Sequence, residues 1–148
     1  MKIRLLKKSD IKKAAAIIGQ NYSGKYEDRA VLELREMFGH SPIKPTFFVA
    51  EDERKIIGLV GFIQSWMDYY IYQIPWVAVT PARQNQGIGK KLVARVITEI
   101  KKNPGADLIL LTADKRTNLP RFYHRFFKFK VLREFDREKE CLMALSLE

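Results

Sequence analysis

The feature that most constrains this chain is a glycine-containing turn between an expected strand and an expected helix. An apolar run from Pro75 to Val79 precedes the turn and has the composition of a strand. Gly87 and Gly89 let the backbone take conformations closed to other residues, and the first turn of a helix has unpaired N–H groups. The helix is predicted from apolar residues at helical spacing, which are Ile88, Leu92, Val93, Val96, Ile97 and Ile100. This turn between strand and helix is therefore suited to binding an anion.

Two well-known phosphate-binding loops do not fit this turn. A dinucleotide-binding fingerprint needs a third glycine, and Leu92 occupies that position. A Walker A loop needs an earlier glycine and a serine or threonine after its lysine, whereas Lys90 is followed by Lys91. The turn must therefore belong to another class of anion site, or to none.

The remaining pattern is Gln84-x-x-Gly87-x-Gly89, preceded by Val79-x-Pro81 and followed by a leucine. A Gly-x-Gly pair before a helix is by itself common in ordinary turns, so the identification depends on the longer pattern. That longer pattern resembles the pyrophosphate-binding signature of the GNAT superfamily of acyl-CoA N-acyltransferases.

The other patterns give the order strand, two helices, three strands, helix, strand, helix and two strands. Pro75 lies within the longest expected strand and would remove a ladder donor, so we predict a bulge or splay at Pro75 and Trp76. Ser9 or Asp10 would cap the first helix, and Gly19 would end it. The expected strands are 2–6, 46–51, 55–64, 69–79, 108–112, 128–135 and 140–147, with the third and fourth helices at 87–102 and from 117 or 118 onward.

This order resembles the GNAT fold over essentially the whole chain. The resemblance implies an α/β fold with a mixed, mostly antiparallel central sheet flanked by helices. It also implies that the fourth and fifth strands, 69–79 and 108–112, run parallel and splay apart, with the helix that begins at Gly87 as their crossover. Acyl-CoA would lie in the wedge between these two strands.

A splay would leave unpaired N–H and C=O groups on Val77, Ala78 and Val79, which need partners if buried. The amide-rich pantetheine arm of coenzyme A could pair with them like an extra strand. Arg83 would stand at the mouth, although for Arg83 and Lys91 a solvated surface charge is an equal alternative. The pyrophosphate would then meet the N–H groups beside the side chain of Gln84, namely those of Gln86, Gly87, Ile88, Gly89 and Lys90.

A second pattern, Asn118-x-x-x-Phe122-Tyr123, resembles a family motif whose asparagine contacts the pantetheine arm and whose tyrosine stands near the thioester sulfur. A phenol with a pKa of roughly 10 is a plausible donor to a thiolate whose conjugate thiol has a pKa of roughly 8.5. Tyr123 is therefore the candidate general acid, the alternative being one more core ring. Pro120 and Arg121 stand where the family usually has a small alanine. Phe127-Lys128-Phe129 replaces the usual glycine-phenylalanine ending, so we expect an irregular helix end.

The general base is left open. Many relatives have a glutamate where Gln73 stands, and glutamine cannot accept a proton, although it can orient water or substrate. Asp68 at the start of the strand and Glu33 on the second helix are further candidates, as are a water or an amine that arrives deprotonated. Oxyanion stabilisation is assigned to the N–H of Val77 or Ala78 beside the bulge.

Composition sets the remaining expectations. At 148 residues we expect one domain, 1–148, and the net charge of +10 fits a polyanionic cofactor, nucleic acid or solubility equally well.

No apolar run approaches the roughly 20 residues of a membrane span, and the first residues do not resemble a signal peptide, so a cytoplasmic protein without a membrane partner is expected. Cys141 is expected in a buried strand, and His40 and His124 lie on different segments, so no metal site is expected.

Two other functions remain as alternatives to an acetyl-CoA-dependent N-acetyltransferase. A catalytically silent acyl-CoA sensor is favoured by Gln73. A nucleic-acid-binding module is suggested by the basic and aromatic stretch 121–130, although helical spacing explains that stretch as well. The expected partner is a small-molecule or peptide amine, and a homodimer is possible because dimers are common among such folds.

Overall fold

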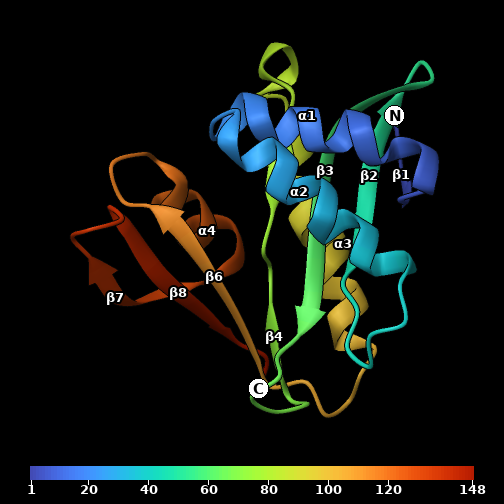
Figure 1. Ribbon diagram of the computed structural model, residues 1–148. Coiled ribbons are helices and arrows are strands. Elements are labelled where there is room, and N and C mark those ends of the chain that lie inside the picture. The colour runs from blue at the N-terminus through green and yellow to red at the C-terminus, as the bar shows by residue number, and fades with distance from the viewer.

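The computed structural model describes residues 1–148 and contains one mixed sheet of eight strands, in the order β1-β2-β3-β4-β6-β8-β7, with β5 beside β4 on β3. Figure 1 shows the sheet with helices on both sides. The strands are β1 (Lys2–Leu5), β2 (Thr46–Asp52), β3 (Lys55–Gln64), β4 (Ile71–Gln73), β5 (Val77–Val79), β6 (Leu108–Asp114), β7 (Lys130–Phe135) and β8 (Glu140–Ser146). The helices are α1 (Ile11–Asn21), α2 (Lys25–Arg35), α3 (Ile88–Lys101) and α4 (Leu119–Phe127). The predicted α/β class is confirmed, and the element order agrees except that one expected strand is two.

The helices divide the sheet into two differently covered halves. In Figure 1, α1 and α2 lie in front of the half that contains β1 to β5, while α3 lies behind it. One apolar core joins α1 and α2 to β2, β3 and β5, and a second joins α3 and α4 to the opposite face. Helix α4 packs against β6 and β8. The front of β6, β8 and β7 carries no helix.

The expected strand 69–79 is two short strands with a break at Ile74–Trp76. Before the break, β4 runs parallel to β6, and the N–H of Ile74 still donates to the C=O of Leu110 at 3.0 Å. After it, the C=O of Trp76 accepts from the N–H of Gly61 on β3 at 3.1 Å, and β5 pairs with β3 alone. The splay predicted at Pro75 is confirmed, and it opens a wedge between β5 and β6.

Three predictions about helix ends are corrected. Helix α1 continues through Gly19 to Asn21. Asp10 does not cap that helix with its side chain; its carboxylate instead accepts hydrogen bonds from Arg4 and from the N–H of Lys7. Helix α4 ends regularly, because Lys128 takes the left-handed conformation that a glycine would take.

Candidate functional site

The turn before α3 presents a row of free backbone donors. Asn85 and Gly87 have positive φ angles of 63° and 81°, so the chain curls before the helix begins at Ile88. The first helical hydrogen bond runs from the N–H of Lys91 to the C=O of Gly87, at 3.1 Å. The N–H groups of residues 86–90 have no partner in the protein. They form the concave donor set that an anion such as a diphosphate requires.

Strand β5 lies next to this turn and has one edge bonded to β3. The C=O of Trp76 accepts from β3 at 3.1 Å, and the N–H of Thr80 donates to β3 at 2.8 Å. Facing residues of an antiparallel pair alternate, so Ala78, halfway between them and opposite Leu59, also bonds to β3. The expectation that Ala78 has free backbone groups is therefore wrong, and its N–H cannot serve as an oxyanion donor.

Val77 and Val79 direct their backbone groups to the open edge of β5. The C=O of Val77 accepts a hydrogen bond from the Tyr22 hydroxyl at 3.2 Å. The C=O of Val79 accepts from the side-chain amides of Asn21 at 2.9 Å and Gln84 at 3.1 Å. Gln84 is thus turned toward β5. The N–H groups of both valines have no partner in the protein, so this edge offers two donors to the wedge.

A hollow of about 210 Å³ on α4 adjoins the first turn of α3. Lys90 at that turn places its Nζ 4.2 Å from the ring centroid of Phe126, which lines the hollow. Asn118 precedes α4 and makes no capping bond with its side chain. The lining residues are Asn118, Arg121, Phe122, Arg125 and Phe126. A larger hollow, of about 750 Å³, lies elsewhere, between the start of α1 and the end of α2.

Arg121 and Arg125 are candidate site residues that sequence reasoning missed. Their basic and aromatic stretch was visible, but it pointed only to the nucleic-acid alternative. The fold places both arginines in the lining of the hollow, and the Nζ of Lys90 contacts the ring of Phe126, which lines it too. Arginine and lysine side chains grouped in this way are suited to phosphate groups. Arg83, in contrast, is held by Asp52 at 3.0 Å and by the side chain of Gln86 at 3.0 Å.

Tyr123 lies on the inner side of α4 and is 5% exposed. Its ring contacts those of Phe122 and Phe129, at centroid distances of 5.2 Å and 5.7 Å. Burial raises the pKa of the Tyr123 hydroxyl above its ordinary value, and the nearby Tyr22 raises it further. Tyr123 is therefore protonated at neutral pH, as a proton donor must be, but it releases its proton less readily than a free phenol.

The candidate bases lie in three different places. Gln73 is exposed at the end of β4, next to the break. Asp68 lies in the loop between β3 and β4, before β4 begins and so at the end remote from the break, and its carboxylate accepts a hydrogen bond from the N–H of Tyr69 at 2.9 Å. The structure therefore does not bring Asp68 to the glycine turn. On α2, Glu33 has a buried Oε1 that lies 3.2 Å from Arg29 without hydrogen-bond geometry.

Other features of the chain contribute less to the site. Cys141 is 1% exposed, which confirms it as a buried strand residue. No group of three or more His, Cys, Asp or Glu side chains is arranged to hold a metal ion. None of the helices is both long enough and apolar enough to span a bilayer.

Comparison with known proteins adds independent findings. Residues 44–126 match the model of a family described as the acetyltransferase (GNAT) domain. A GNAT-family protein from Desulfovibrio desulfuricans has the same fold, with a TM-score of 0.86, 19% identity and 99% coverage of both chains. A search of curated proteins found no match.

Two further solved structures share this fold. YncA from Salmonella typhimurium, solved with its cofactor acetyl-CoA, has a TM-score of 0.78 and 20% identity over 100% of this chain and 94% of its own. An aminoglycoside 6′-N-acetyltransferase complexed with coenzyme A has a TM-score of 0.77 and 18% identity over 100% of this chain and 98% of its own.

Proposed function

Because the chain belongs to the GNAT acetyltransferase family, we propose that it is an N-acetyltransferase that passes an acetyl group from acetyl-CoA directly to a primary amine. The observation that carries the proposal is the pairing of two free donor sets. The N–H groups of residues 86–90 lie next to the open edge of β5, where Val77 and Val79 offer two more. Residues 1–148 would act as one catalytic domain, while a cytoplasmic location and a homodimer stay predictions.

Acetyl-CoA would bind these N–H groups in one orientation. Its diphosphate would accept hydrogen bonds from residues 86–90, and its pantetheine carbonyls would accept them from Val77 and Val79. Asn118 has a free side chain at the start of α4 for a further contact with the arm. Lys90, Arg121 and Arg125 would meet the remaining phosphate charge. YncA and the aminoglycoside enzyme, which share this fold, were solved with acetyl-CoA and coenzyme A.

The proposed reaction is direct transfer of the acetyl group from the thioester to the amine. The neutral amine nitrogen forms a bond to the acetyl carbon, the carbon–sulfur bond breaks, and the thiolate leaves. Tyr123 would donate its proton to that thiolate and regain one from solvent. The N–H of Val77 beside the break would stabilise the developing oxyanion, since Ala78 is excluded. Gln73 would orient the amine or a water that takes the amine's proton, and Asp68 is too remote to do so.

The runner-up is a silent acyl-CoA sensor, because Gln73 stands where a proton acceptor is often found. Thiol release in the presence of amines distinguishes it from an enzyme. A nucleic-acid module receives less support, because Arg121 and Arg125 line a small hollow next to the glycine turn. A steep salt dependence of RNA or DNA affinity would favour such a module.

The test combines binding and turnover. Calorimetry should show acetyl-CoA binding to wild type and to Tyr123→Phe with equal affinity. Thiol release with a panel of amines should show kcat reduced by about 100-fold in Tyr123→Phe, the usual contribution of a positioned acid. The proposal is wrong if acetyl-CoA does not bind, and the role of Tyr123 is wrong if Tyr123→Phe keeps full turnover.

A further inference from the structure

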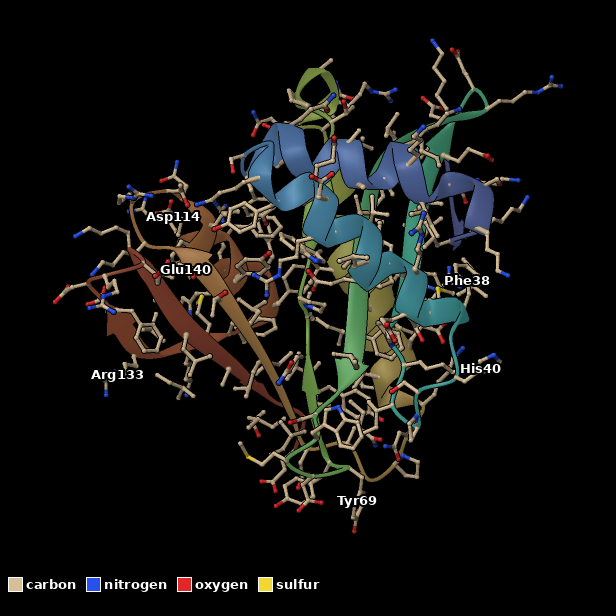
Figure 2. The ribbon with its side chains drawn as sticks, viewed as in Figure 1. Phe38, His40, Tyr69, Asp114, Arg133 and Glu140 are labelled. Atoms are coloured by element: carbon tan, nitrogen blue, oxygen red, sulfur yellow. The ribbon has the colours of Figure 1, made fainter.

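The hollow of about 750 Å³ between the start of α1 and the end of α2 lies outside the proposed acetyl-CoA site. Helix α1 reaches the wedge with its other end, where Asn21 contacts β5, and its 11 residues span about 15 Å. Figure 2 shows Phe38, which lines the hollow, on the opposite side of the molecule from Asp114 and Glu140. No lining residue belongs to the glycine turn or to β5. A ligand in this hollow therefore leaves the acetyl-CoA site free.

The floor of the hollow is apolar and comes from three elements. Ile11 lies in the first turn of α1, Val31 lies on α2, and Phe38 ends the short 3₁₀ helix that follows α2. Ile11 is 8% exposed, whereas Val31 and Phe38 are half-buried. An apolar side chain of a ligand can therefore contact all three without any rearrangement of the core beneath them.

The rim of the hollow is basic. Lys8, Lys12 and Arg35 line it, and all three are exposed. The Nζ of Lys8 lies 5.9 Å from the ring centroid of Phe38, so this side chain reaches from the turn before α1 to the turn after α2. None of the three cations takes part in an ion pair, and no carboxylate lines the hollow. The hollow thus combines an apolar floor with positive charge that the protein itself does not neutralise.

The surface around the hollow favours an extended peptide over other anions. Except for Ile11, the lining side chains are exposed or half-buried, whereas small-molecule sites enclose most of their ligand. Leu32 is 64% exposed and lies three positions before Arg35, so the two are neighbours on α2. A peptide can therefore continue from the hollow to Leu32. Single-stranded nucleic acids bind through stacked rings, but the hollow offers the single ring of Phe38, beside the Lys8 ammonium.

We infer that this hollow binds an acidic segment of a partner protein. One apolar side chain of the segment lies on the floor formed by Ile11, Val31 and Phe38, and its carboxylates lie beside Lys12 and Arg35. Arginine binds carboxylates through two parallel hydrogen bonds, which gives the contact geometric specificity. The net charge of +10 steers an acidic partner toward the protein. The inference goes beyond acetyl transfer and does not depend on it.

The test is fluorescence anisotropy with a labelled peptide in which glutamates flank a phenylalanine and a leucine. Salt of about 0.15 M reduces the Debye length to about 8 Å, so that distant charges are screened. The double variant Lys12→Gln/Arg35→Gln should bind this peptide about tenfold more weakly than wild type, because two contacts with carboxylates are lost. The matched control is Lys13→Gln/Lys101→Gln, which removes the same charge from exposed positions outside the hollow and should bind as wild type does. An unchanged thermal midpoint shows that each variant is folded.

Two further probes separate the apolar and charged parts of the contact. A peptide with serine in place of phenylalanine and leucine should bind several-fold more weakly, because it leaves the apolar floor uncovered. A labelled thymidine oligonucleotide should bind no better to wild type than to Lys12→Gln/Arg35→Gln.

Three results overturn the inference. They are no binding of the acidic peptide at up to about 1 mM, equal losses of affinity in the two double variants, and an oligonucleotide that binds more tightly than the peptide and depends on Lys12 and Arg35. The affinity for acetyl-CoA should be the same in both double variants, because neither changes the acetyl-CoA site. Failure of the proposed function is thus distinct, since it appears as a loss of acetyl-CoA binding or of thiol release in the wild type.

Discussion

Lys128 ends α4 with φ 70° and ψ 22°, a conformation that is strained for any residue with a side chain. Its N–H donates to the C=O of His124 at 3.0 Å, and the N–H of Phe129 donates to the C=O of Tyr123 at 3.3 Å. These two bonds make a regular helix end. The buried ring of Phe129 then packs against Tyr123, so the strained residue helps to fix the position of the candidate acid.

Lys128→Gly should raise the free energy of unfolding by about 1 kcal/mol, because glycine adopts this conformation without the clash of its Cβ atom. Urea unfolding monitored by circular dichroism measures the change. Lys128→Ala is the control, since it removes the charged chain but keeps the Cβ atom, and it should give no such gain. Equal stabilisation by alanine and glycine would show that the charge, and not the backbone, is responsible.

Residue identities within the site were predictable where the motif is local. The free N–H groups of residues 86–90 follow from a glycine turn and a helix start, both visible in the sequence. The different states of Ala78 and Val77 depend on their register with β3, which no local pattern gives. Tyr22 was missed for a similar reason, because its contact with Val77 joins segments 55 residues apart.

At the scale of elements, the break between β4 and β5 illustrates what a single residue type can predict. Pro75 indicated where the strand would fail, and the structure confirms it. The exchange of partner, from β6 before the break to β3 after it, depends on how the rest of the sheet assembles. The interruption was therefore predicted from the sequence, but β4 and β5 were expected to be one strand.

Asp10 joins three elements that the sequence treated separately. It was expected to cap a helix, yet its carboxylate accepts from Arg4 on β1 at 2.7 Å and from the N–H of Lys7 at 2.8 Å. Arg4 also bonds to Glu51 on β2 at 3.1 Å. Burial acts to raise the pKa of Asp10, but the hydrogen bonds from Arg4 and Lys7 outweigh it and hold the pKa below its ordinary value of 3.8.

Asp10→Asn should lower the free energy of unfolding at neutral pH by about 2 kcal/mol, the size of a hydrogen bond to a charged group. The folded pKa lies below the unfolded one, so this contribution is present above the ordinary value of 3.8 and is lost as pH falls through the folded pKa. The stabilities of wild type and variant should therefore begin to converge only below pH 3.8, and should approach each other further as the pH is lowered. Asp28→Asn, at an exposed position of α2, is the control. Curves that stay parallel down to the lowest pH would contradict this account.

At the scale of the whole molecule, the order of elements was enough to predict the fold class. It was not enough to predict which face of β6, β8 and β7 stays uncovered, because that depends on α1 and α2 packing together over the other half of the sheet. The positive charge was equally ambiguous in the sequence, whereas the structure shows that Arg121 and Arg125 line one hollow and that Lys90 contacts its Phe126.

The net charge of +10 should make acetyl-CoA binding depend on salt. We expect the KM for acetyl-CoA to rise several-fold as NaCl increases from 0.1 M to 1 M, where the Debye length falls from about 10 Å to about 3 Å. Initial rates at saturating amine measure this. The control is the donor without its ribose phosphate, acetyl-dephospho-CoA, whose KM should respond less. A KM that does not change with salt would mean that the basic surface has another purpose.

The open edge of β5 also limits which ligands can pair with it, because its free donors have a fixed spacing. The carbonyls of Val77 and Val79 already accept hydrogen bonds from Tyr22, Asn21 and Gln84. A ligand can therefore pair only with the N–H groups of these two valines, which are about 7 Å apart as for alternate strand residues. A thioester on a simple alkyl chain has no hydrogen-bond acceptors for these two N–H groups. On the proposed function, this edge would therefore favour a carrier that contains repeating amides, whatever acyl group it carries.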